Sequence, residues 1–215
     1  MYLVIFSFRE MIMQEDVSLN IKIAIEESIK AKELVLKQEL YKVLIEIGNS
    51  IVESILRGGK VLLCGNGGSA ADAQHLTAEF LIRLTSEVNR EGIPAISLLQ
   101  DSSTFTAAIN DFNSNDLFAR NLKTLCKPED ILIAISTSGN SENIVKVLET
   151  AKQIKIKTIG FLGSEGGESL KHCDLAFIVP SNKTARIQEV HITAGHAVIE
   201  YVEARLIEEG FLGLS

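Results

Sequence analysis

The first quarter of the chain carries apolar residues at the spacing of an amphipathic helix. From Asp16 to Arg57 they recur every three or four positions, which places them on one helical face. A glycine pair at 58–59 ends the pattern, and Gln38 or Gly48 marks a candidate break within it. About forty residues of amphipathic helix are more than a monomer readily buries. We therefore expect this arm to take part in oligomerisation.

Beyond the arm, short apolar runs alternate with helical patterns. The runs have the unbroken hydrophobicity of buried parallel strands, and DILIAIS at 130–136 is the clearest of them. This alternation predicts an α/β fold: a doubly wound parallel sheet with helices on both faces, in a flavodoxin-like three-layer arrangement. The expected strands span 60–65, 93–99, 130–136, 157–163 and 175–181, and the expected helices span 69–84, 103–111, 115–126, 141–154, 167–173 and 185–210. We expect one domain, in which a helical arm over 1–58 precedes the sheet region over 59–215.

Composition and charge argue against several classes of function. The 215 residues carry a formal net charge of -7, whereas a nucleic-acid surface needs a basic stripe, so we expect no nucleic-acid partner. No apolar run is long enough for a transmembrane helix, so we expect no membrane partner. The three cysteines are widely spaced, which favours free thiols and a cytoplasmic location. The apolar start lacks the basic region of a signal peptide, and Met11 or Met13 is an alternative start to Met1.

Two expected strand ends are followed by loops suited to an anion. GNGGS at 65–69 opens a helix, where glycines admit a ligand close to the backbone and free N–H groups point outward. It lacks the P-loop lysine and the GxGxxG spacing of a dinucleotide site. STSGNS at 136–141 places four hydroxyls at another helix N-terminus, and a helix cap needs only one. This second loop therefore favours a phosphate monoester.

A carboxylate and several imidazoles lie on the two helices beside these loops. His75 and Glu79 share one face of the helix expected at 69–84, and the final helix carries Gln188, His191 and His196. A metal held by imidazole and carboxylate fits this set, and so does general acid–base catalysis on a sugar phosphate. Solvated or core histidines are the alternative. Gln188 and His196 are eight residues apart, about 12 Å along one helix, which favours a site shared between subunits.

Four stretches together resemble a known family. They are CGNGGSAADAQHLTAEF (64–80), AINDF (108–112), ISTSGNS (135–141) and ARIQEVHITAGH (185–196). In order and spacing they are similar to the phosphoheptose isomerases of the sugar isomerase (SIS) superfamily. The resemblance implies a SIS domain that converts sedoheptulose 7-phosphate to D-glycero-D-manno-heptose 7-phosphate, toward lipopolysaccharide or capsule. It also implies a homotetramer with active sites between subunits and one zinc ion (Zn2+) per subunit.

The resemblance also implies a role for each matching residue. The zinc ligands it implies are His75, Glu79, Gln188 and His196. Glu79 and His196 match the proton-transfer pair of an enediolate mechanism, in which Asp111 orients a hydroxyl or the imidazole. The substrate contacts it implies are Asn66, Gly67, Gly68, Ser69, Glu79, Asn110, Asp111 and Gln188, together with the phosphate contacts Ser136, Thr137, Ser138 and Ser141.

Two features keep other interpretations open. A close relative of this family is an adaptor of the bacterial replication initiator and shares much of these motifs, so a non-catalytic adaptor is an alternative. A sugar-phosphate sensor, which binds its ligand without converting it, is another. The chain also departs from the family pattern, since Leu99 and Gln100 stand where threonines are common, and Asn121 stands where glutamine is common. These departures bear on the exact sugar preference.

Overall fold

The middle layer of the protein is a five-stranded sheet with the order β2-β1-β3-β4-β5. The computed structural model describes residues 2–99 and 101–213, and it describes side chains from Val17 onward, except that of Ser18. All four strand pairings are parallel, which confirms the predicted doubly wound α/β fold. The strands are β1 (Val61–Gly65), β2 (Ala95–Ser97), β3 (Ile131–Ser136), β4 (Lys157–Gly163) and β5 (Leu175–Val179).

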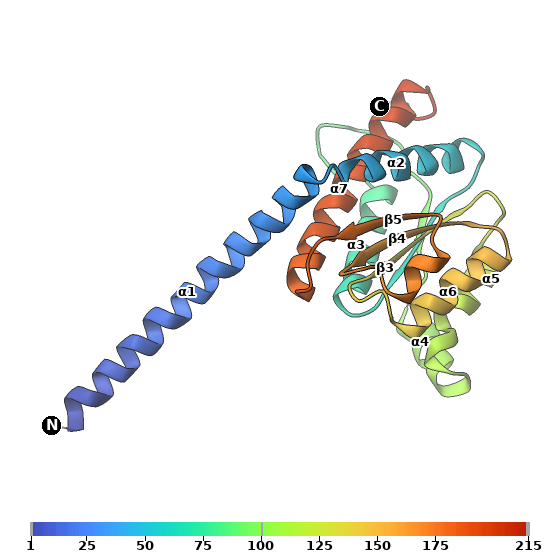
Figure 1. The fold of residues 1–215 in the computed structure, drawn as a ribbon. Helices are drawn as coiled ribbons and strands as arrows, with labels where there is room; N and C mark the ends of the chain where they lie inside the picture. The colour runs from blue at the N-terminus through green and yellow to red at the C-terminus, as the bar shows by residue number, and fades with distance from the viewer. Residues whose placement is uncertain (1, 100, 214–215) are drawn as a thin grey trace.

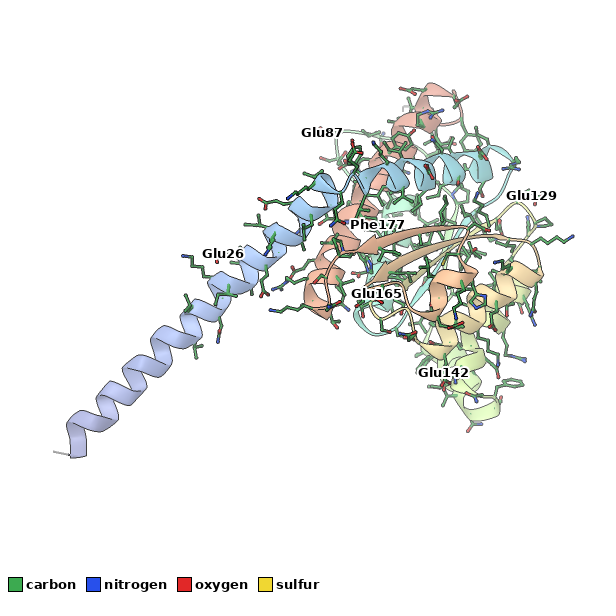
Figure 2. The ribbon with its side chains drawn as sticks, viewed as in Figure 1. Glu26, Glu87, Glu129, Glu142, Glu165 and Phe177 are labelled. Atoms are coloured by element: carbon green, nitrogen blue, oxygen red, sulfur yellow. The ribbon has the colours of Figure 1, made fainter. Side chains whose placement is uncertain are left out.

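Helices cover both faces of this sheet, as Figure 1 shows. Successive strand residues point to opposite faces. On β1, Val61 and Leu63 face the helices α2, α3 and α7. Phe177 of β5, labelled in Figure 2, belongs to the same core cluster. Leu62 and Cys64 face the layer of α5 and α6. The helices are α1 (Tyr2–Lys37), α2 (Tyr41–Leu56), α3 (Gly68–Leu81), α4 (Ser102–Asp111), α5 (Leu117–Leu125), α6 (Glu142–Gln153) and α7 (Thr184–Glu208), with 3-10 turns η1 (Ser114–Asp116) and η2 (Glu168–His172).

The predicted elements are all present, with corrected boundaries. The helix expected at 115–126 divides into η1 and α5, and β2 is shorter than expected. Of the two candidate breaks in the arm, only that near Gln38 is right, since α1 ends at Lys37 and Glu39 has a φ of 55°. Gly48 lies inside α2, where a Cβ would stand 2.5 Å from the ring of Tyr201. The division of the domain at residue 58 stays a prediction.

The first helix projects from the body of the protein. Figure 1 shows α1 extending away from the sheet, and Glu26 in Figure 2 lies on the projecting part. Near its end, Ala31 and Val35 are buried in the core. The helix is held there by Arg186 of α7, whose Nη1 donates to the carbonyl oxygen of Ala24 at 2.7 Å. Met1 lies outside the described residues. Within 2–99 and 101–213, no helix has the length and hydrophobicity to cross a membrane.

His191 belongs to the core and not to a site, which confirms the core alternative for this residue. It is 1% exposed on α7, and its Nε2 donates to the carbonyl oxygen of Leu162 at 3.0 Å. The rings of Phe161 and Phe177 lie beside it. Its Nδ1 is buried and finds no hydrogen-bond partner among the described residues. Burial lowers the pKa of His191 from 6.5 to about 4.

This buried imidazole predicts an acid-sensitive fold. As the pH falls from 6.5 to about 4, the unfolded chain binds a proton at His191 before the folded chain does. The free energy of unfolding should therefore fall through this window by about 3 kcal/mol from this residue. Urea unfolding of wild type and His191→Gln at several pH values measures the difference. Equal pH slopes for the two proteins would contradict the prediction.

Candidate active site

The first loop, between β1 and α3, exposes backbone rather than side chains. Gly67 has φ 53° and ψ −119°, a conformation that a residue with a side chain rarely adopts. No atom lies within 4 Å of a Cβ built there. Glycine is therefore required at this position by the backbone conformation and not by a lack of space. Asn66, Gly67 and Gly68 are exposed, whereas Ser69 is 4% exposed. The loop thus opens the N-terminus of α3 to a ligand.

Helices α3 and α7 pack closely beside this loop. A Cβ on Gly68 would lie 2.5 Å from Nε2 of Gln188, and a Cβ on Gly195 would lie 2.7 Å from both Cδ atoms of Leu76. The missing side chains let the two helices approach, which brings residues far apart in sequence to the same place.

The close packing brings His75 and His196 together within one chain. Their Nε2 atoms are 2.8 Å apart, and their rings meet edge to face. Oε1 of Glu79 is 3.6 Å from Nε2 of His75. These three side chains meet within one chain, and the expected site between subunits stays a prediction. Gln188 lies at the level of Gly68, about two helical turns before His75.

Asp72 is a member of this cluster that the sequence analysis missed. It lies three residues before His75 on the same face of α3. Its Oδ2 is buried and has no hydrogen-bond partner among the described residues. Burial raises the pKa of Asp72, and the nearby His75 and His196 oppose that rise. The signal was the spacing of Asp72, His75 and Glu79, which puts all three on one helical face.

In the second loop, STSGNS, two hydroxyls accept hydrogen bonds from backbone N–H groups; Ser138 is exposed, whereas Ser136 is 4% exposed. The Ser136 Oγ accepts from the backbone N–H of Gly139 at 3.1 Å, and the Ser138 Oγ accepts from that of Asn140 at 3.1 Å. Each hydroxyl can still donate. Ser141 is the N-cap residue of α6, but its side chain makes no capping hydrogen bond. Capping therefore does not account for this hydroxyl, which favours the phosphate interpretation.

The two loops are neighbours, and a pair of amides joins them. Gly65 and Ile135 are register partners, so the loops after β1 and β3 leave the same edge of the sheet. Asn66 and Asn143 exchange two hydrogen bonds, each of 2.8 Å between Nδ2 and Oδ1. Asn143 in the first turn of α6 is a second residue that sequence reasoning missed, because no motif separates it from an ordinary helix residue.

Asn110 and Asp111 lie apart from the imidazole pair. They are exposed at the end of α4, where Nδ2 of Asn110 donates to Oδ1 of Asp111 at 2.7 Å. No hydrogen bond among the described residues joins them to His75, Glu79 or His196. A cleft of about 500 Å³ separates α4 from the first loop. Its lining includes Asn66, Gly67, Ala71, Gln74, Phe105, Ile109, Ser114, Phe118 and Asn143.

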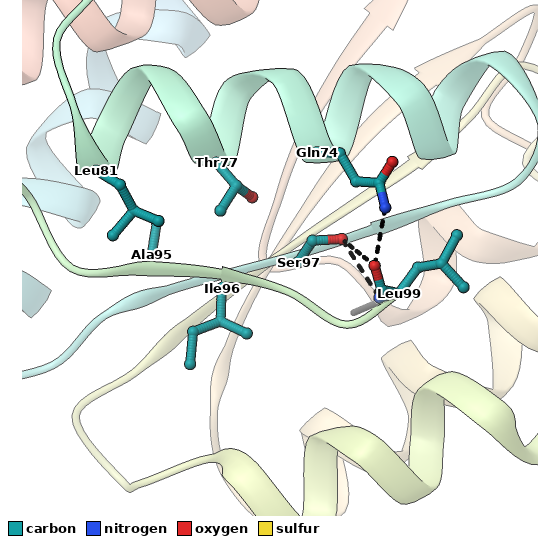
Figure 3. Close-up of a pocket in the computed structure, with 7 residues that line it drawn as sticks. All are labelled: Gln74, Thr77, Leu81, Ala95, Ile96, Ser97 and Leu99. Carbon is teal, nitrogen blue, oxygen red and sulfur yellow. Dashed lines mark hydrogen bonds between the residues drawn. The ribbon is translucent and has the colours of Figure 1, made fainter. Parts of the chain in front are cut away.

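A second hollow, of about 370 Å³, adjoins this cleft along α3 and shares Gln74 and Leu99 with it. Figure 3 shows Gln74, Thr77 and Leu81 of α3 above β2, with Leu99 beyond the strand. Nε2 of Gln74 donates to the carbonyl oxygen of Leu99 at 3.0 Å. Leu99, one of the departures from the family pattern, is thus held by its backbone, while Gln100 lies outside the described residues. Asn121 donates to the neighbouring Leu98 carbonyl oxygen at 2.7 Å.

Comparison with known proteins gives one consistent family. A family model described as the SIS domain matches residues 26–163. The phosphoheptose isomerase of Clostridium acetobutylicum is 48% identical over 193 residues, 88% of this chain and 96% of that protein. That of Roseiflexus sp. is 47% identical over 86% of this chain and 92% of that protein. The solved phosphoheptose isomerase of Francisella tularensis has a TM-score of 0.81 at 34% identity, covering 86% and 97% of the two chains. That of Neisseria gonorrhoeae has a TM-score of 0.80 at 32% identity, covering 87% and 99%.

The chain belongs to the phosphoheptose isomerase family. Both the family model and the relatives match most of the chain, so the similarity is not limited to the four motifs. The resemblance seen in the sequence is confirmed.

The metal implied by the family is compatible with the side chains at the α3–α7 contact. Within the described residues, no three His, Cys, Asp or Glu side chains already converge as metal ligands do. The Nε2 atoms of His75 and His196 are 2.8 Å apart, whereas two nitrogens on one tetrahedral zinc stand about 3.3 Å apart. A small rotation of either ring reaches that separation. Two imidazole nitrogens beside the Glu79 carboxylate are donors that zinc accepts, so the residues fit the ion.

The conformation of Gly67 predicts a cost for any side chain there. Gly67→Ala should lower the free energy of unfolding by about 1–3 kcal/mol, because the new residue must hold a disfavoured backbone conformation. Steric clash adds nothing, since the space around its Cβ is open. Urea denaturation measures the change. Gly213→Ala is the matched control, because its Cβ is also unobstructed and its φ is ordinary. An equal, small effect at both positions would refute this account of the loop.

Proposed function

We propose that this protein is a cytoplasmic isomerase that converts sedoheptulose 7-phosphate to D-glycero-D-manno-heptose 7-phosphate through an enediolate, for lipopolysaccharide or capsule heptose. The names of its relatives support the reaction. The observation that carries the proposal is the packing of His75, Glu79 and His196 into one carboxylate–imidazole cluster. The hydrogen bonds between Asn66 and Asn143 join the first turn of α6, which follows the hydroxyl-rich loop at 136–141, to the loop that opens α3, the helix of His75 and Glu79.

The phosphate of the substrate would be bound by the loop at 136–141. Its hydroxyls and the free N–H groups at the N-terminus of α6 provide neutral donors, and the helix dipole favours a negative charge there. Ser136, Thr137, Ser138 and Ser141 are the contacts we assign. The sugar chain would then run past the first loop, with Asn66, Gly67, Gly68 and Ser69, toward Glu79 and Gln188.

Proton transfer falls to Glu79 and His196. The Glu79 side chain is 18% exposed, so it is accessible to a substrate and yet partly shielded from water. We assign it the removal of the C1 proton, and we assign His196 the transfer of a proton between the oxygens or to C2. Asp111, with Asn110, would orient a hydroxyl from the α4 side. Neither residue lines the cleft between α4 and the first loop, so this assignment rests on the family resemblance.

A zinc ion, one per subunit, would be held by His75, Glu79, Gln188 and His196. When bound, it would supply a Lewis acid that polarises the carbonyl group of the sugar. Gln188 lies against Gly68, at the N-terminus of α3. Its amide would therefore have to extend along the helix pair toward the imidazoles of His75 and His196.

We further propose a homotetramer with the sites between subunits, and no nucleic-acid or membrane partner. The support is the apolar surface of α1, where Val17, Ile21, Ile25 and Ile29 are each more than half exposed. Such a stripe on a projecting helix lacks cover in one chain and suits another copy of it.

A turnover assay tests the proposed function. Purified protein with sedoheptulose 7-phosphate should form the aldose product, and a chelator should reduce the rate because the zinc ligands lose their ion. Enzymatic or chromatographic detection of the aldose measures both arms. Binding without conversion would instead identify a sugar-phosphate sensor. Neither binding nor conversion would favour the adaptor.

Replacement of the proposed base gives the sharpest variant. Glu79→Gln should lower kcat by about 10²–10⁴-fold or more, because the amide cannot accept the proton. The side chains have nearly the same shape, so assembly should be unchanged by size-exclusion chromatography. Steady-state kinetics with sedoheptulose 7-phosphate measures the loss. Turnover close to that of wild type would remove Glu79 from the chemistry.

A further inference from the structure

A buried ion pair joins the segment after α3 to α7, and neither of its residues has been assigned a role so far. Arg90 is 7% exposed and Glu203 is 6% exposed. Nε of Arg90 donates to Oε2 of Glu203. Arginine and glutamate are rarely buried unless they are paired, and the pair repays its desolvation only if further hydrogen bonds satisfy it. The position of those further bonds shows what the pair does.

The other donors of Arg90 reach carbonyl oxygens at the end of α3. Nη2 donates to the Glu79 carbonyl oxygen at 3.0 Å, and Nη1 donates to that of Phe80 at 3.1 Å. Nη1 also donates to the carbonyl oxygen of Glu91 at 2.9 Å. The last carbonyls of a helix have no partners within it, and a cation there is favourable. Arg90 therefore holds the helical turn that carries the proposed base, at the backbone of the base itself.

Glu203 connects this turn to the helix of the second catalytic group. It lies seven residues after His196 on α7, about two turns, and so on the same side of the helix. The helices are thus joined at two levels. His75 contacts His196 at one level. About two turns further along α7, the Arg90–Glu203 pair joins the last turn of α3 to α7.

We propose that Arg90 and Glu203 are positioning residues of the active site, which clamp the last turn of α3 to α7 and so set Glu79 against His196. Neither residue touches the substrate. The proposal rests on the proposed function, because it refers to the turnover that Glu79 and His196 perform. A guanidinium suits the task, since its planar fork donates to a carboxylate and three carbonyl oxygens at once, whereas a lysine offers one point charge.

The test compares Arg90→Lys with a matched control elsewhere in the chain. Lysine keeps the charge opposite Glu203 but loses the fork that reaches the carbonyl oxygens of Glu79 and Phe80. Lys60 and Asp130 form another buried pair, with side chains 15% and 0% exposed, where β1 and β3 begin. Asp130→Asn breaks that pair, whose hydrogen bonds among the described residues go to Lys60 and Lys127 and not to α3 or α7. Both variants are measured for Tm, for kcat and KM with sedoheptulose 7-phosphate well below Tm, and for hydrogen exchange of residues 76–84.

The clamp predicts different results for the two variants. Arg90→Lys should lower kcat about 10- to 100-fold with little change in KM, because a displacement of about 1 Å at a catalytic group costs that much. It should also speed hydrogen exchange in the last turn of α3. Asp130→Asn should lower Tm while it leaves kcat and that exchange near wild type. An Arg90→Lys protein that loses only Tm would overturn the proposal, because the pair would then only stabilise the fold.

A second variant guards against misfolding. If Arg90→Lys does not fold, the double variant Arg90→Met with Glu203→Met replaces the pair by apolar side chains, which often preserves stability. It should fold, exchange faster at residues 76–84 and lose kcat; wild-type kcat and exchange would overturn the clamp. If the wild type itself has no turnover, the proposed function fails. The exchange of residues 76–84 then decides the clamp by itself.

Discussion

Helices α3 and α7 approach each other closely at two points where a glycine of one helix faces a side chain of the other, and the geometry of the site depends on this contact. Gly68 lies against Gln188, and Gly195 lies against Leu76. Between and beyond these points stand the groups that the proposed chemistry uses. A larger residue at either glycine would have to displace a neighbour, and the imidazoles of His75 and His196 would separate. The helices thus serve as one rigid unit that the chain assembles from segments more than a hundred residues apart in sequence.

Much of this architecture follows from local sequence pattern. Unbroken apolar runs such as 130–136 identify buried parallel strands, because both faces of a central strand are covered. The loops are equally local, since glycines or hydroxyls directly after a strand mark an exposed helix N-terminus. Boundaries were less predictable where tertiary contacts decide them. Helix α3 ends at Leu81 and not at residue 84. At this end the carbonyl oxygen of Phe80 accepts hydrogen bonds from the backbone N–H of Ile93 and from Arg90, in place of a bond within the helix.

The residues that sequence reasoning missed act through distant partners. Asn143 pairs with Asn66, and Arg90 pairs with Glu203, over separations of 77 and 113 residues. Nothing in the neighbourhood of either residue signals such a partner, and a single sequence holds no record of the pairing. Asp72 differs from them, because its spacing from His75 and Glu79 was readable as one helical face. A search for a complete polar face on α3, in place of a search for two ligands, would have found it.

An acidic protein that binds a phosphate dianion must overcome its own net charge of -7. The loop at 136–141 offers neutral donors, whose strength depends on orientation, so the loop has to be held in place before the ligand arrives. Its support comes from the segment after β4. The backbone N–H of Ser169 donates to the carbonyl oxygen of Gly139 at 2.8 Å, and that of Glu168 donates to Oδ1 of Asn140 at 2.9 Å. A loop fixed in this way would lose little conformational entropy on binding a phosphate, which would favour binding by neutral donors.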